Sequence, residues 1–88
     1  MITQEFTIKN RLGLHARASA KLVQTANRFR SEVFISKEGE EVNGKSIMGI
    51  LMLAAAIGSK IEVRISGEDA DAAFAAISQL IEDKFGED

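Results

Sequence analysis

The segment Gly13-Leu14-His15-Ala16-Arg17-Ala18-Ser19 holds the only histidine of the chain, and the other predicted elements are arranged around it. A glycine loop ends in this segment and a helix begins, with His15 at the boundary and Arg17 two positions further on. Backbone N–H groups at a helix start have no partner within the helix, and the helix dipole favours negative charge there. A nucleophilic imidazole beside these donors predicts a site that holds a phosphoryl group on the histidine itself.

On both sides of this segment, the spacing of apolar residues predicts four strands and three helices in the order β-α-β-β-α-β-α. Strands are predicted at residues 2–8, 31–36, 40–42 and 60–66, and helices at residues 16–29, from Ser46 to Gly58, and from Asp69 to Gly86. One apolar face on each strand and one apolar stripe on each helix predict a two-layer α+β sandwich. Because the 88 residues contain no linker, repeat or low-complexity stretch, we expect a single domain, residues 1–88.

Two polar residues are predicted to begin helices as caps. The side-chain oxygens of Ser46 and Asp69 can accept hydrogen bonds from the free backbone N–H groups of the turns that follow them. The helix after Asp69 is expected to bury an apolar stripe that consists of Ala73, Phe74, Ile77, Leu80, Ile81 and Phe85.

The composition is that of an ordinary globular protein, with 45% apolar and 27% charged residues. No cysteine is present, which suits a reducing compartment. The first residues lack the basic start and apolar run of a signal peptide, and the longest apolar stretch, residues 50–57, is too short to span a bilayer. A cytoplasmic protein without membrane association is therefore expected.

The charges are distributed unevenly along the chain. Residues 1–30 carry six basic side chains and one acidic side chain, whereas the remaining residues carry five basic and twelve acidic ones. A basic surface around His15 would attract phosphate and an acidic protein partner. Nucleic acid is not expected as a partner, because the chain is acidic overall and has no Tyr or Trp to stack on bases.

His15 and Arg17 are the residues expected to perform chemistry. A lone histidine is often only a surface or core residue, so the neighbouring arginine matters for the interpretation. The spacing at the helix start places the guanidinium of Arg17 within reach of a phosphate on His15, where it can donate two hydrogen bonds. A metal site is not expected, because the chain offers no second histidine and no cysteine.

Residues 39–46 match the phosphate-binding loop pattern G-x-x-x-x-G-K-[ST]. Two observations argue against nucleotide binding. Glu40 and Glu41 would place carboxylates in a loop that must hold phosphates, and the chain is too short for the parallel sheet of a nucleotide hydrolase. The remaining prediction is that Ser46 caps a helix and offers a hydroxyl beside Ile47 and Met48.

The helix after Ser46 has more large apolar residues than one core-facing stripe needs. We expect Ile47 and Leu51 to pack inward, while Met48 and Met52 face outward and contact a partner, a use that suits methionine. The alternative is a short helix that is buried on all sides.

Taken together, these residues resemble the HPr family, the histidine phosphocarriers of the bacterial phosphotransferase system. The segment 13–17 resembles the active-site signature of that family, and the segment 44–49, Gly-Lys-Ser-Ile-Met-Gly, resembles its regulatory serine segment. The resemblance covers essentially the whole chain. It implies an open-faced sandwich, in which a four-stranded antiparallel sheet carries three helices on one face.

The resemblance also implies roles for individual residues. His15 would accept a phosphoryl group on Nδ1 from Enzyme I, charged by phosphoenolpyruvate, and pass it to a histidine of an Enzyme IIA. Ala16 and Arg17 would bind the phosphoryl group, and Arg17 would stabilise it during transfer. Ser46 would be the target of the kinase/phosphorylase that some bacteria use. The partner surface would consist of Ala20, Lys21, Lys45, Ile47, Met48 and Met52.

Such a carrier is not an enzyme, needs no cofactor and is expected to be a monomer. Ala18 departs from the proline that sugar-branch carriers usually have at this position, and it leaves the sugar branch and the nitrogen-related branch both open. Two other classes also remain. An acylphosphatase-like hydrolase would use Arg17 but not His15, and a small regulatory interaction domain would use neither residue.

Overall fold

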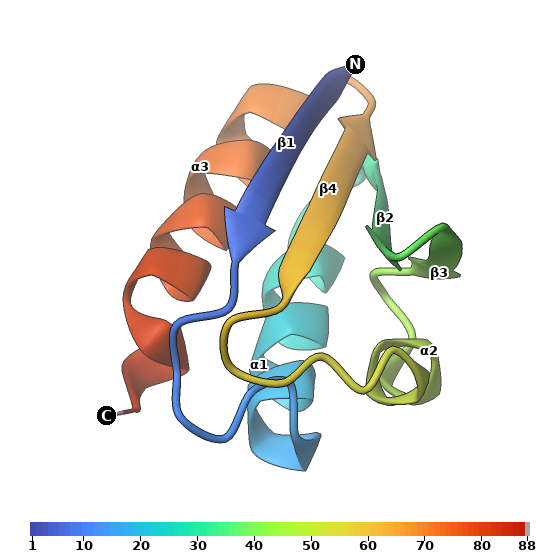
Figure 1. The fold of residues 1–88 in the computed structure, drawn as a ribbon. Helices are drawn as coiled ribbons and strands as arrows, with labels where there is room; N and C mark the ends of the chain where they lie inside the picture. Colours follow the sequence, from blue (N-terminus) through green and yellow to red (C-terminus); the bar gives the residue numbers. More distant parts are fainter. Residues whose placement is uncertain (88) are drawn as a thin grey trace.

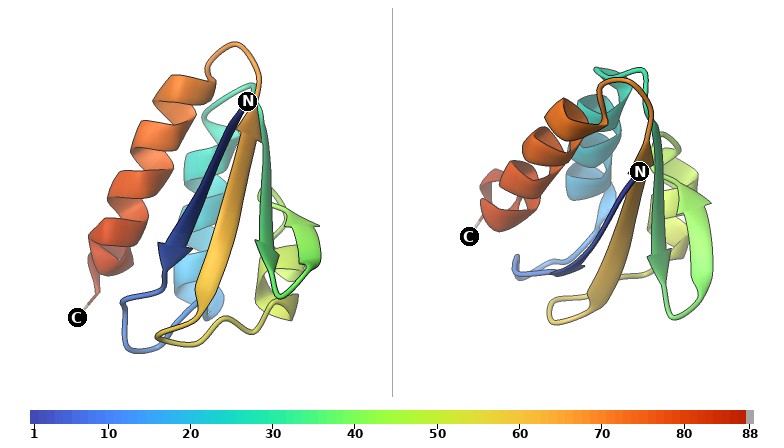
Figure 2. Two further views of the ribbon diagram at one scale, coloured as in Figure 1. Left: turned by 45° about the horizontal axis from the view of Figure 1, so that its top comes forward. Right: turned by 90° about the horizontal axis from the view of Figure 1, so that it is seen from above.

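The computed structural model describes residues 1–87 as a sheet of four strands with helices on one of its faces (Figure 1). The strands are β1 (Ile2–Thr7), β2 (Glu32–Lys37), β3 (Glu40–Asn43) and β4 (Lys60–Ser66), and the helices are α1 (Ala16–Asn27), α2 (Ile47–Met52) and α3 (Ala70–Glu82), followed by the 3₁₀ turn η1 (Lys84–Gly86). Figure 2 shows the other face of the sheet without a covering layer. The predicted open-faced α+β sandwich and its element order are confirmed.

The sheet has the order β1-β4-β2-β3, and every neighbouring pair is antiparallel. Strand β4 lies between β1 and β2, and its residues Ile61, Val63 and Ile65 are buried on the helix side, in agreement with their alternating pattern. Strands β2 and β3 are joined by a two-residue turn in which Glu38 and Gly39 both have positive φ, at 53° and 85°. This turn has the backbone twist that tight hairpins favour.

The core fills the space between the sheet and the helices. Helix α1 contributes Ala18, Leu22 and Ala26, which recur at helical spacing and are fully buried. Within the predicted stripe of the last helix, Ala73, Ile77, Ile81 and Phe85 are buried, whereas Phe74 and Leu80 are only partly buried. No helix within residues 1–87 combines the length and the apolar character that crossing a membrane requires.

Two predicted helices extended too far. Helix α2 ends at Met52, not near Gly58, because Ala54 takes a positive φ of 50° and the chain turns into a loop. The loop buries Leu53 and Ala55, so its apolar residues serve the core without a helix. Helix α3 ends at Glu82, and Phe85 reaches the core from η1 with a φ of 57°.

The prediction that Asp69 caps its own helix was wrong. Asp69 precedes α3 and makes no side-chain hydrogen bond to that helix. Its carboxylate instead accepts hydrogen bonds from the backbone N–H groups of Arg30 and Ser31 and from the hydroxyl of Ser31. Asp69 therefore joins the start of α3 to the segment that enters β2. The hydrogen bond from the Ser31 hydroxyl is the largest cause that lowers the pKa of Asp69, from 3.8 to about 2.

Because of this contact, we expect the stability of the protein to decrease at low pH. A carboxylate whose pKa is lowered on folding stabilises the fold above its unfolded pKa, and this contribution is lost as the pH falls towards the folded value. The contribution of Asp69 should therefore disappear between about pH 4 and pH 2. Urea midpoints measured across this range should fall less steeply for Asp69→Asn, which should already be less stable at pH 7. Parallel curves for the two proteins would contradict this assignment.

Candidate functional site

His15 lies where the loop after β1 becomes α1. It is the N-cap residue of the helix and has extended backbone angles, and its carbonyl accepts the first helical hydrogen bond from the N–H of Ser19 (2.8 Å). The preceding Gly13 has a φ of 67°, and a Cβ on it would lie 2.4 Å from the carbonyl oxygen of Ala55. Only glycine fits at this position, because both the backbone angle and the space exclude a side chain. The sequence correctly predicted this loop-to-helix boundary.

Free N–H groups lie beside the imidazole. Within residues 1–87, the backbone N–H groups of Ala16 and Arg17 have no hydrogen-bond acceptor, as expected in the first turn of a helix. The side chain of His15 does not cap these groups. The start of α1 therefore offers donors and the positive end of its dipole to an anion at this place.

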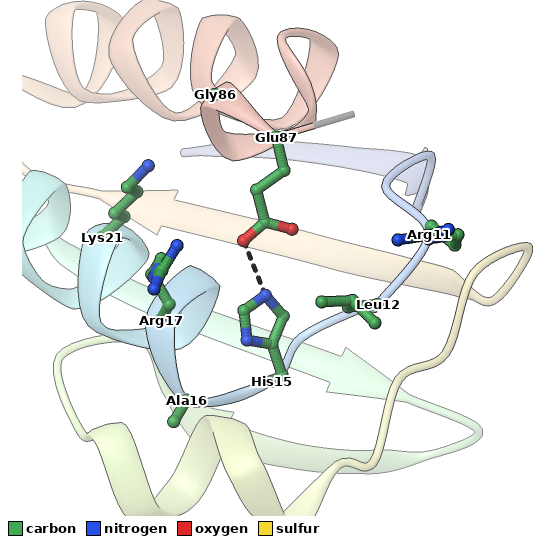
Figure 3. A pocket seen from close by; sticks show the side chains of 8 residues that line it. All are labelled: Arg11, Leu12, His15, Ala16, Arg17, Lys21, Gly86 and Glu87. Carbon is green, nitrogen blue, oxygen red and sulfur yellow. Dashed lines mark hydrogen bonds and ion pairs between the residues drawn. The ribbon is translucent and has the colours of Figure 1, made fainter.

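A carboxylate far away in the sequence holds the imidazole from the opposite side. Nε2 of His15 lies 2.6 Å from Oε2 of Glu87, and Figure 3 shows the other ring nitrogen directed towards the start of α1. The second carboxylate oxygen of Glu87 accepts a hydrogen bond from Nδ2 of Asn10 (3.1 Å). Asn10 is completely buried and also donates to the carbonyl of Gly13 (2.7 Å). A carboxylate on Nε2 favours the tautomer with its proton there, which leaves the lone pair on Nδ1.

The surroundings of Glu87 keep its carboxylate ionised. Desolvation raises the pKa of Glu87, but hydrogen bonds from Asn10 and His15 and electrostatic interactions with the His15 ring and with Lys21 outweigh this effect and lower the pKa below its ordinary value. A charged acceptor thus faces Nε2 at neutral pH.

His15 opens into a pocket of about 560 Å³, whose lining comes from the loop before α1, the first turns of α1 and the segment after α3 (Figure 3). The lining residues are Arg11, Leu12, His15, Ala16, Arg17, Lys21, Gly86 and Glu87. Three of these side chains are basic and one is acidic, so the pocket favours an anion. Within residues 1–87, Arg17 makes no ion pair or side-chain hydrogen bond, and its guanidinium is available to a ligand.

The lysines assigned to the partner surface have bonds within the chain. Nζ of Lys21 donates to the carbonyl of Phe85 (2.6 Å), and Nζ of Lys45 donates to the carbonyl of Phe29 (2.9 Å). Ala20 is half-buried on α1.

Ser46 caps α2 as predicted, because its Oγ accepts a hydrogen bond from the N–H of Gly49 (3.1 Å). Residues 39–46 form a hairpin strand and the turn into α2. The N–H of Gly44 is bonded to the carbonyl of Val33. The residues that would form a phosphate-binding loop are therefore paired in a strand, so the segment does not have the structure of a nucleotide-binding loop.

Helix α2 exposes three large apolar side chains. Ile47, Met48 and Met52 are 42%, 68% and 66% exposed, while Ile50 is buried and Leu51 is half-buried. The prediction that Ile47 packs inward was therefore wrong. The cap at Ser46 fixes where the first turn begins, and this register directs Ile50 towards the core instead of Ile47.

Asn10 and Glu87 are part of the site but were not predicted from the sequence. Glu87 is 72 positions from His15, so no local pattern connects the two residues. The only local signal was Gly86, a glycine with positive φ at which the chain bends after α3. Within residues 1–87, no group of three or more His, Cys, Asp or Glu side chains is arranged to hold a metal ion.

The family model described as "PTS HPr component phosphorylation site" matches residues 2–83. The chain belongs to the HPr family. It is 54% identical over 88 residues to the phosphocarrier protein HPr of Xylella fastidiosa strain Temecula1, covering 100% of this chain and 99% of that protein. It is 53% identical over 87 residues to the phosphocarrier protein HPr of Neisseria meningitidis serogroup A, covering 99% and 98% of the two chains.

A crystal structure of HPr from Thermoanaerobacter tengcongensis superimposes with a TM-score of 0.96 at 43% identity, over 100% of this chain and 99% of that one. HPr proteins are phosphocarriers of the phosphotransferase system and not catalysts, so the predicted non-enzymatic role is confirmed. The alternative of an acylphosphatase-like hydrolase is not supported.

Proposed function

We propose that this HPr-family chain receives a phosphoryl group on Nδ1 of His15 from Enzyme I, charged by phosphoenolpyruvate, and passes it to a histidine of an Enzyme IIA. The observation that carries the proposal is the difference between the surroundings of the two ring nitrogens. Nε2 is held by Glu87, while the other ring nitrogen lies at the start of α1, beside the free N–H groups of Ala16 and Arg17. The two nitrogens therefore have different surroundings, and only the Nδ1 side suits an anion.

Each transfer exchanges one bond to phosphorus for another. The bond to the donor breaks as the bond to Nδ1 forms, and the proton on Nε2 stays on the ring, where Glu87 accepts its hydrogen bond. Arg17 and the N–H groups of Ala16 and Arg17 stabilise the charge on the phosphoryl oxygens. The reverse sequence at an Enzyme IIA returns His15 to its original state.

The surface around the site suits an acidic partner. The exposed side chains of Ile47, Met48 and Met52 form an apolar patch on α2, which packs against α1. We assign this patch, together with Ala20, Lys21 and Lys45, to the docking of Enzyme I and Enzyme IIA. Basic side chains around an apolar centre speed the encounter with an acidic protein and fix its orientation.

The carrier is proposed to work as a cytoplasmic monomer of one domain, without cofactor, metal, membrane or nucleic acid. The test incubates the chain with phosphoenolpyruvate and Enzyme I, and then adds Enzyme IIA proteins of the sugar branch and of the nitrogen-related branch. Transfer to at least one of them supports the relay and identifies the branch. A chain that takes no phosphoryl group from Enzyme I would contradict the proposal.

Ser46 is proposed as a regulatory phosphorylation site for the kinase/phosphorylase of this family. A phosphate there adds about −1.5 to −2 charges next to the apolar patch, where a docking partner would have to desolvate them and meet like charge. The fold should be retained, because an anionic oxygen can still accept the hydrogen bond that Oγ receives from Gly49.

Ser46→Asp is therefore expected to weaken Enzyme I docking and to slow phosphorylation of His15, more strongly at low salt. Its melting temperature should stay nearly unchanged, because aspartate is as good an N-cap as serine. Ser66→Asp, which adds the same charge at the exposed end of β4, is the control and should dock normally. Normal docking of Ser46→Asp would exclude the switch, and a large drop in its melting temperature would place the effect in the fold.

A further inference from the structure

The segment after α3 turns back to the pocket through an unusual run of backbone angles. Lys84, Phe85 and Gly86 have φ values of 57°, 57° and 76°. Two of these three residues have a side chain, for which this left-handed region is unfavourable. Such a turn persists only where the surrounding contacts hold it.

Two contacts hold the turn in place. The ring of Phe85 is completely buried in the core, and its carbonyl accepts a 2.6 Å hydrogen bond from Nζ of Lys21 on α1. A Cβ on Gly86 would lie 3.2 Å from Nζ of Lys21, so the absence of a side chain leaves room for the lysine. In Figure 3 the amino group of Lys21 points towards the backbone of this turn.

The turn determines where the next residue lies. Glu87 follows Gly86 directly, and its two carboxylate oxygens contact Nε2 of His15 and Nδ2 of Asn10. The same helix thus supplies the histidine at its N-terminus and, about two turns later, the lysine that anchors the carboxylate facing it.

We propose that Lys21 is a positioning residue, which anchors the turn 84–86 and thereby holds the Glu87 carboxylate on Nε2 of His15. Lys21 acts on the imidazole through Glu87. Because the Glu87 carboxylate stays on Nε2, the ring keeps its proton there and has its lone pair on Nδ1. This role differs from partner docking, because it operates in the free protein. Only its effect on transfer rests on the proposed function.

The test measures the tautomer of His15 in the free, unphosphorylated protein, from ¹⁵N chemical shifts and two-bond ¹H–¹⁵N couplings at a pH where the ring is neutral. The wild-type protein should be mainly the Nε2–H tautomer. Lys21→Met should lose this preference and show an increased Nδ1–H fraction, and Lys21→Arg, which keeps a charged donor, should restore at least part of it. Glu87→Ala should show the full loss.

The control is Lys9→Met, which removes the ion pair of Lys9 with Glu82 at the end of α3 but leaves the turn and Glu87 in place. It should keep the wild-type tautomer. Amide spectra of the β4 residues verify that each variant is folded. A wild-type tautomer in folded Lys21→Met would overturn the proposal, as would a changed tautomer in Lys9→Met that equals the change in Lys21→Met.

The tautomer measurement and the phosphorylation assay test the positioning role of Lys21 and the phosphoryl relay independently. If the tautomer follows the prediction but Enzyme I does not phosphorylate the chain, the positioning role stands and the relay is wrong. If the chain is phosphorylated and Lys21→Met keeps its tautomer, the relay stands and Lys21 is not a positioning residue. If both hold, Lys21→Met should also be phosphorylated several-fold more slowly when Enzyme I is saturating, an effect that weaker docking alone would not produce.

Discussion

Replacing His15 by alanine is expected to abolish phosphoryl transfer and to leave the fold intact. No other histidine is present in the chain to take over the nitrogen–phosphorus bond. The imidazole contributes little to folding, because it does not cap α1 and its main contact is with Glu87 at the rim of the pocket. Incubation with phosphoenolpyruvate and Enzyme I, followed by an assay for acid-labile phosphate, should show none in His15→Ala.

The melting temperature is the control for this experiment. A value close to that of the wild-type protein would assign the loss of transfer to chemistry, since a carrier that unfolds would also lose activity. Acid-labile phosphate that persists in the variant would contradict the role of His15. Phosphate that is stable to acid would indicate a hydroxyl such as that of Ser46 and would leave the prediction intact.

The second large effect is expected at Arg17. Its guanidinium has no partner within residues 1–87 and lines the pocket beside His15, so its charge is free to act on the transferring group. Arg17→Ala should slow transfer by about 100- to 1,000-fold, the loss that accompanies removal of one donor to a developing anion. Arg17→Lys should recover only part of the rate, because an ammonium group lacks the planar pair of donors.

The matched control is Arg28→Ala, which removes an exposed arginine from the other end of the same helix, where it lies over the ring of Phe29. Transfer should be normal in this variant. Rates measured at saturating Enzyme I separate chemistry from docking, and the loss in Arg17→Ala should persist there. Equal rates for Arg17→Ala and the wild-type protein would make Arg17 a solvated surface residue.

Features that depend on neighbouring residues could be predicted from the sequence. The alternation of Ile61, Val63 and Ile65 predicted the strand at residues 60–66 with the bounds that β4 has. Gly13 and His15 predicted the loop-to-helix boundary, because a positive φ and a helix start both leave local signals. Ser46 predicted its cap for the same reason.

Features that depend on contacts between distant segments could not be predicted in this way. The carboxylate of Asp69 was expected to cap its own helix. It instead accepts hydrogen bonds from the N–H groups of Arg30 and Ser31, which are 39 and 38 positions away in the sequence. The contact of Glu87 with His15 depends on left-handed angles at Lys84 and Phe85, which no sequence pattern indicates for residues with side chains. The sequence therefore predicted the position of the imidazole at the helix start but missed the side chains that contact its Nε2 side.

The proposed transfer through His15 depends on the difference between its two ring nitrogens, and this difference can be measured directly. The protein is labelled with ¹⁵N, phosphorylated with phosphoenolpyruvate and Enzyme I, and analysed through ¹⁵N–³¹P couplings and ¹H–¹⁵N correlations of the imidazole. The contact of Glu87 with Nε2 and the position of the other ring nitrogen at the start of α1 predict phosphorus on Nδ1 and a proton on Nε2. Phosphorus on Nε2 would show that Glu87 leaves the ring during transfer and would contradict the account.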